Sequence, residues 1–168
     1  PALPGNIMAS VKHFALYGAV EGGRDYNIVD MSPTRMFQDY LPPYHAAIDA
    51  GAGSVMVALN SINGVPATSN TWLMQDLLRK QWGFKGVAVS DHGAILELIK
   101  HGVAKDEREA ATLAIKAGVD MSMNDLVYGK ELPGLIRSGK VPQSDLDNAV
   151  REVLGAKYDM GLFKDPYL

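Results

Sequence analysis

Several side chains that could do chemistry stand where short apolar runs of the chain end. Lys12 and His13 lie in the first run, Asp91 and His92 follow the third, and polar residues at 122–125 close the fourth. A carboxylate can act as a nucleophile, a general base or an acceptor, while Lys and His donate hydrogen bonds to hydroxyl groups. These residue types suit a binding site for a neutral polar ligand, provided that the fold brings the ends of these runs close together.

Each of these side chains also has a purely structural interpretation. An Asp directly after a strand often caps the next helix, so Asp91 could be an N-cap. Lys12 could be a solvated charge at the rim, and His13 a core histidine with satisfied hydrogen bonds. Asp120, inside the fourth run, is predicted to make structural hydrogen bonds rather than to take part in catalysis. Spacing alone leaves the alternatives open for Asp91, Lys12 and His13.

Four short apolar runs predict buried strands of a parallel sheet with both faces covered. They are residues 9–14, 54–59, 86–90 and 119–123. The step from Val55 to Val87 is 32 positions, and so is the step from Val87 to Val119, which indicates a βα unit repeated at nearly constant length. We therefore expect an α/β chain of four βα units, either a small open sheet or half of an eight-unit barrel. In the barrel case, unpaired strand edges imply that the rest of the barrel is missing.

The segments between these runs carry helix signals. Ser32-Pro33 should cap a helix that Pro42-Pro43 breaks or kinks and Gly51 ends, and Trp72 should share a buried face with leucines 73, 77 and 78. Further helices are expected at 94–100, 106–116, 131–137 and 144–158, the last opened by a capping box of Ser144 and Asp147. The methionines at 56, 121 and 123 are predicted to fill the core of a barrel rather than to contact a ligand.

Composition excludes several classes of function. The 168 residues carry 16 basic and 19 acidic side chains, a net charge of −3, and no basic run that could follow a phosphate backbone or an anionic membrane. Nucleic acid and membrane are therefore not expected as partners. There is no Cys, no apolar stretch long enough to cross a bilayer, and no metal-ligand spacing of His, Asp and Glu. Residues 1–5 lack the pattern of a signal peptide.

Four stretches of sequence, in this order, resemble glycoside hydrolase family 3 over nearly the whole chain. They are the Lys-His-Phe at 12–14, the Val-Met-Val at 55–57 with Asn-Gly-Val-Pro at 63–66, the Leu-Leu-Arg at 77–79 leading to Gly-Phe-Lys-Gly at 83–86, and the Ser-Asp at 90–91. The likeness is strongest to bacterial β-glucosidases of the periplasm, through the stretches 90–94 and 157–163. The resemblance implies a periplasmic location.

The resemblance also implies an architecture. Residues 1–158 would form the C-terminal half of the family's N-terminal (β/α)8 barrel, and residues 159–168 the start of a linker to an absent second domain. The remainder of its own chain would then be the main protein partner. Neither a metal nor an organic cofactor is implied.

The resemblance assigns roles residue by residue. Asp91 matches the nucleophile of a retaining exo-β-glucosidase that acts on a β-glucoside or oligosaccharide by double displacement. Lys12 and His13 match the pair that binds sugar hydroxyls in the −1 subsite, and Met56 matches a residue near it. His92, beside the nucleophile, is counted with the substrate-binding residues.

Three departures from the family pattern matter. Leu59 stands where many members carry Tyr, and His92 stands where many carry Trp, so a tight aromatic clamp on the leaving-group sugar is not expected. The acid/base Glu comes from the second domain in the family and is missing here. Residues 15–19 read Ala-Leu-Tyr-Gly-Ala, unlike the Pro-Gly-His-Gly signature of the hexosaminidase branch, which favours a glucosidase.

Two other functions compete with this interpretation. The isolated chain could be a catalytically incomplete fragment, because a missing general acid removes leaving-group protonation, worth about 10²–10⁴-fold in rate. Lys12 at a strand end could alternatively be the Schiff-base lysine of a barrel lyase.

Overall fold

The computed structural model describes residues 7–167. Its strands are β1 Ser10–Phe14, β2 Ile28–Val29, β3 Ser54–Val57, β4 Ser61–Ile62, β5 Val65–Pro66, β6 Val87–His92 and β7 Met121–Met123. Its helices are α1 Pro33–Arg35, α2 Pro42–Asp49, α3 Ala94–Lys100, α4 Glu107–Ala117, α5 Val127–Arg137 and α6 Gln143–Asp159, with π-helical segments at Met36–Tyr40 and Trp72–Gln81. Segment 1–5, considered above for a signal peptide, lies outside the described residues.

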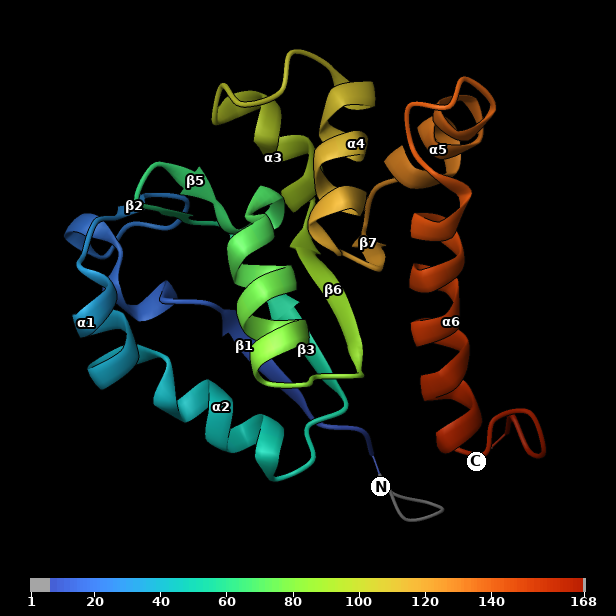
Figure 1. The fold of residues 1–168 in the computed structure, drawn as a ribbon, viewed down its shortest axis with the longest axis horizontal. Coiled ribbons are helices and arrows are strands. Elements are labelled where there is room, and N and C mark those ends of the chain that lie inside the picture. Colours follow the sequence, from blue (N-terminus) through green and yellow to red (C-terminus); the bar gives the residue numbers. More distant parts are fainter. Residues whose placement is uncertain (1–6, 168) are drawn as a thin grey trace.

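The four predicted strands form one parallel sheet in the order β1-β3-β6-β7. Val55 of β3 pairs with Val11 of β1 on one side and Ala88 of β6 on the other. Helices connect successive strands, and α6 runs alongside the β6–β7 side of the sheet (Figure 1). The prediction of an α/β chain with a parallel sheet is confirmed.

The two faces of this sheet are covered differently. Val55, Val57 and Ala88 are fully buried beneath the connecting helices. On the opposite face Met56 pairs with Val89, which pairs in turn with Met121, whose exposed fraction is 40%. Within residues 7–167 this face of the sheet is only partly covered, so the prediction that the strand methionines fill the core of a barrel stays a prediction.

Side-chain caps account for the starts of several helices. The Ser32 hydroxyl accepts the Arg35 amide at 3.3 Å, Asn70 Oδ1 accepts the Leu73 amide at 3.0 Å, and Asp106 Oδ1 accepts the Glu109 amide at 2.8 Å. The segment after Ser32 changes from π-helix to α-helix at Leu41, directly before Pro42-Pro43. The cap predicted at Ser32 and the break predicted at Pro42-Pro43 are confirmed.

Three details of the helices differ from the sequence-based expectation. Trp72 is 40% exposed and packs edge-to-face on Phe37, so it flanks the buried face of its helix rather than belonging to it. The capping box at Ser144 does not form, because α6 already begins at Gln143, behind Pro142. The helix expected at 131–137 begins at Val127, whose amide is accepted by Asp125 Oδ1 at 3.1 Å.

A second, three-stranded sheet in the order β2-β4-β5 was not predicted. Asn63 and Gly64 turn the chain between β4 and β5 with φ values of 48° and 84°, as a tight hairpin of type I′ requires. Asn63 also binds both backbone groups of Met31, through Oδ1 at 2.9 Å and Nδ2 at 3.0 Å. The Asn-Gly pair was the available signal for this hairpin.

Candidate active site at the carboxyl end of the sheet

Asp91 lies near the end of β6, on the sheet face that the helices leave open. It follows Val89 by two positions, so its side chain points to the same face as Met56. The side chain is 14% exposed, and Oδ1 accepts the backbone amide of His92 at 2.6 Å. The N-cap of α3 is Gly93, and no side-chain cap bond is made there. The interpretation of Asp91 as a helix cap is therefore wrong.

His13 of β1 and Asp91 of β6 come together although β3 separates their strands. His13 Nε2 lies 3.3 Å from Asp91 Oδ2, and the imidazole is 22% exposed. The contact is open because β3 is short at this end: Val57, its last residue, pairs with Ser90, one position before Asp91. His13 is thus an accessible partner of the carboxylate and not a core histidine.

Two tyrosines surround His13. The ring of Tyr17 lies against the imidazole with centroids 4.5 Å apart, and its hydroxyl donates to the carboxylate of Asp25. The hydroxyl of Tyr44, on α2, donates to the His13 carbonyl at 2.6 Å. Neither tyrosine was among the predicted site residues. Neither could be found from spacing, because each lies in a connecting segment and contacts His13 only in the folded chain.

The surroundings raise the pKa of both phenols. The hydrogen bond to Asp25 raises the pKa of Tyr17 to about 12, with further contributions from burial and from the charges of Asp25 and Asp91. Burial raises the pKa of Tyr44, and the backbone amides of Leu16 and Tyr17 partly oppose that rise. Both hydroxyls therefore remain protonated donors at neutral pH.

The other expected site residues lie around this pair less closely. Lys12 is exposed and, within the described part of the chain, its ammonium makes neither a hydrogen bond nor an ion pair. Met56 is half-buried on β3, level with Val89. His92 is exposed at the rim, where its Nε2 contacts the side-chain amide of Asn124. The structure brings His13 and His92 to Asp91 but records no contact of Lys12 or Met56 with it.

Hydrogen bonds hold the end of β6 against the end of β7. The Ser90 hydroxyl donates to the Asp91 carbonyl at 2.8 Å and accepts the Met123 amide at 2.8 Å. The Gly93 amide donates to the Met123 carbonyl at 3.0 Å. These bonds fix the backbone on either side of Asp91, so the carboxylate stands on a rigid strand end.

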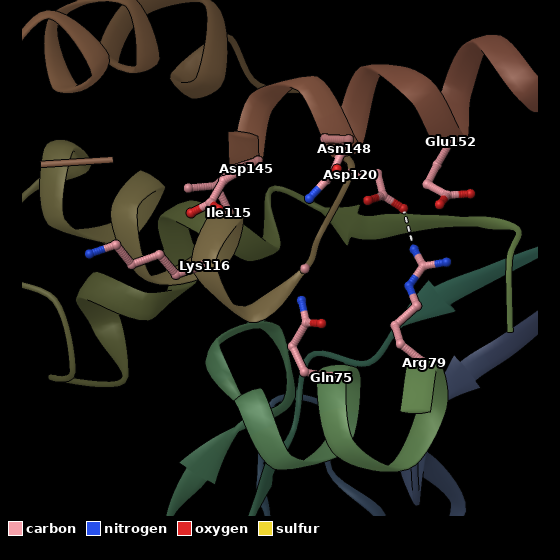
Figure 2. Close-up of a pocket in the computed structure, with 10 residues that line it drawn as sticks. Gln75, Arg79, Ile115, Lys116, Asp120, Asp145, Asn148 and Glu152 are labelled. Carbon is pink, nitrogen blue, oxygen red and sulfur yellow. Dashed lines mark hydrogen bonds and ion pairs between the residues drawn. The ribbon is translucent and has the colours of Figure 1, made fainter. Parts of the chain in front are cut away.

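Asp120 belongs to a different place in the fold. A cavity of about 240 Å³ opens between the π-helix Trp72–Gln81, the start of β7 and α6, and Asp120, Arg79 and Glu152 line it (Figure 2). Asp120 Oδ2 accepts from Arg79 Nη2 at 2.6 Å and from the Ala88 amide at 2.7 Å. The structural role predicted for Asp120 is confirmed.

Residues 7–167 show neither a membrane-spanning helix nor a cluster of metal ligands. No described helix is both long and apolar enough to cross a membrane. In the same part of the chain, no three His, Asp or Glu side chains gather as metal ligands would. The chemistry that the geometry offers is that of a carboxylate on a rigid strand end with an imidazole beside it, facing an open surface.

The chain is similar to known proteins over nearly its whole length. Residues 4–156 match the model described as the glycosyl hydrolase family 3 N terminal domain. The chain is 66% identical to the periplasmic beta-glucosidase of Salmonella typhimurium, covering 99% of this chain and 22% of the relative, and 40% identical to a beta-xylosidase of Formosa agariphila, covering 94% and 23%.

Among solved structures, the beta-glucosidase from Listeria innocua superposes with a TM-score of 0.94 at 51% identity, over 96% of this chain and 22% of that one. Its structures include complexes with glucose and with isofagomine. The chain thus spans about a fifth of the length of the relatives that it matches.

Proposed function

The chain belongs to glycosyl hydrolase family 3, and on that premise we propose that it supplies the nucleophile and part of the sugar site of a retaining exo-β-glucosidase. The observation that carries the proposal is the pair of Asp91 and His13, whose Oδ2 and Nε2 atoms are 3.3 Å apart at the carboxyl end of the parallel sheet. In barrel enzymes this end of the strands carries the reacting groups. The names of the relatives support a β-glycoside as substrate.

In the proposed reaction, Asp91 bonds to the sugar. One carboxylate oxygen attacks the anomeric carbon, the bond to the leaving oxygen breaks, and that oxygen takes a proton from an acid/base residue outside this chain. Water then adds to the same carbon with overall retention of configuration, releasing the sugar and freeing Asp91. The negative charge of Asp91 stabilises the positive charge that develops on the ring in both steps.

The neighbouring side chains have proposed roles that follow their positions. His13 donates a hydrogen bond from its imidazole either to Asp91 or to a sugar hydroxyl. Lys12, an exposed ammonium on the same strand, binds a hydroxyl of the sugar in the −1 subsite. Met56 forms an apolar floor near that subsite, and His92 contacts the leaving-group side from the rim.

We further propose that residues 1–158 form the second half of a (β/α)8 barrel. The open face of the sheet, with Met56, Val89 and Met121 in one row, would then become part of the barrel interior. β1 and β7 are the edge strands that the other half would pair with. Residues 159–168 would begin the linker to a second domain. The similarity to a periplasmic beta-glucosidase supports the periplasm as the location of this protein.

The isolated chain should then be an incomplete enzyme. A retaining glycosidase needs two carboxyl groups about 5–5.5 Å apart, and we expect the second to come from outside the chain. We define the complete protein as this chain together with the segments that its full-length relatives carry. Hydrolysis of a nitrophenyl β-glucoside is measured for the isolated chain and for the complete protein, and only the complete protein should be active. Full turnover by the isolated chain contradicts the proposal that the acid/base residue lies outside it.

The identity of the nucleophile is tested in the complete protein by replacing Asp91→Ala. Hydrolysis of a nitrophenyl β-glucoside should fall by several orders of magnitude, and added azide should restore release of nitrophenol with α-glucosyl azide as product. Azide would attack from the face that Asp91 vacates, hence the inverted product. Asp125→Asn, a change to another Asp that follows a strand, is the control and should retain activity. Normal turnover without Asp91 excludes it as the nucleophile.

A further inference from the structure

The hydrogen bond from Tyr44 to the His13 carbonyl joins α2 to the strand that carries the candidate imidazole. It is 2.6 Å long, spans 31 positions of sequence, and lies in a partly buried setting. A phenol held in one place by burial of its ring is a fixed donor, so the carbonyl that it binds is fixed as well.

Tyr44 also contacts the residue that follows His13. The ring of Phe14, the next residue after His13, meets the Tyr44 ring edge-to-face with centroids 5.5 Å apart. The backbone amides of Leu16 and Tyr17 partly oppose the rise of the Tyr44 pKa. Tyr44 thus contacts two consecutive residues, His13 and Phe14.

The side chain of His13 is held from the other side. The Tyr17 ring lies against the imidazole, with centroids 4.5 Å apart and planes inclined by 41°. With its carbonyl fixed by Tyr44 and its ring flanked by Tyr17, His13 keeps Nε2 directed at Asp91 Oδ2. Displacement of either support would let the imidazole turn away from the carboxylate.

We propose that Tyr44 is a positioning residue of this site, which acts through His13 and touches neither the sugar nor Asp91. The inference rests on the proposed glycosidase function. Positioning matters because a shift of about 1 Å in a group of an active site lowers rates by about 100-fold.

The chain offers a matched control. Tyr128 donates its hydroxyl to the Val119 carbonyl at 2.8 Å, also in a partly buried setting. Both tyrosines therefore make one phenol-to-carbonyl hydrogen bond, but only that of Tyr44 ends on a residue of the candidate site. Removing either hydroxyl takes the donor from one carbonyl in a partly buried hydrogen bond, so the loss of stability should be similar.

The experiment compares Tyr44→Phe and Tyr128→Phe in the complete protein. Both variants should lower the melting temperature by similar amounts. Only Tyr44→Phe should lower kcat/KM for a nitrophenyl β-glucoside, by about 10- to 100-fold. Equal activities of the two variants overturn the proposal.

A double-mutant cycle distinguishes positioning from a general loss of structure. If Tyr44 acts through the His13 imidazole, Tyr44→Phe should cause no further loss of kcat/KM in a protein that already carries His13→Ala. The His13 carbonyl is still present in that variant, so the effect on melting temperature should persist. Additive losses of kcat/KM in the double variant count against the proposal.

A readout independent of turnover separates this inference from the proposed function. The imidazole resonances of His13 in a ¹H–¹⁵N spectrum should move in Tyr44→Phe and stay in place in Tyr128→Phe. If the wild-type protein hydrolyses no β-glucoside but the resonances move as expected, the positioning role stands and the proposed function fails. If the protein is active and the resonances do not move, the positioning role fails alone.

Discussion

Arg79 Nη2 donates to Asp120 Oδ2 at 2.6 Å, in an ion pair whose side chains are only 16% and 7% exposed. The same guanidinium donates through Nη1 to the carbonyls of Phe84 at 3.2 Å and Gly86 at 2.6 Å (Figure 2 shows the ion pair). The π-helix Trp72–Gln81 is thereby tied to the segment that leads into β6 and to the start of β7. This bonding lies away from the candidate nucleophile and acts on stability.

Replacing Arg79→Ala should therefore lower the free energy of unfolding by about 3–5 kcal/mol, because it leaves the buried Asp120 carboxylate without its counter-ion. The measurement is urea unfolding followed by circular dichroism. Lys80→Ala is the control: Lys80 pairs with Asp76 on the surface, with side chains 73% and 50% exposed, and should cost less than about 1 kcal/mol. Equal losses in the free energy of unfolding from the two changes would show that the buried pair contributes no more to stability than the surface pair.

Asp120 should make stability depend on pH. Burial raises the pKa of this carboxyl from 3.8 to about 6, against the opposing effects of Arg79 and the Ala88 amide and with a smaller rise from Glu152. Because the folded pKa is the higher one, the unfolded chain releases the proton first, and this group's contribution to stability falls as pH rises from about 4 to about 6. The full contribution is of the order of 3 kcal/mol.

This pH dependence is measured from urea unfolding at pH 4 and at pH 6.5, in the wild type and in Asp120→Asn, whose amide stays neutral. Between the two pH values the wild type should lose stability relative to the variant. The same change with pH in both proteins would show that Asp120 does not titrate in this range.

Two glycines should respond oppositely to Ala. A Cβ on Gly86 would lie 2.2 Å from the Gly53 carbonyl oxygen and 2.7 Å from the Phe84 ring, so Gly86→Ala must push β6 away from β3. We expect a loss of about 3 kcal/mol or more in the free energy of unfolding. A Cβ on Gly129, inside α5, would meet nothing within 4 Å, and Gly129→Ala should stabilise the protein by about 0.5–1 kcal/mol. Thermal unfolding of both variants checks the opposite signs.

Local sequence was sufficient for most of the elements. The four main strands followed from short apolar runs, the last three of them at a constant interval, since a strand buried on its helix side must be apolar wherever it lies in the fold. The helix start at Ser32 followed from a capping side chain, which acts within one turn of the chain. Where local signals conflicted, as Pro142 did with the capping box at Ser144, the pattern gave the wrong start.

The candidate site shows what the sequence determined by itself and what only the tertiary structure decided. The residue types, Asp91 after one strand and His13 within another, could be read from the chain, because parallel strands bring their carboxyl ends to one edge. The 3.3 Å contact between them depends on a strand order that places β3 between them and ends it early. The supports at Tyr17 and Tyr44 come from connecting segments whose positions are set by packing over long distances in sequence, and no local pattern encodes such contacts.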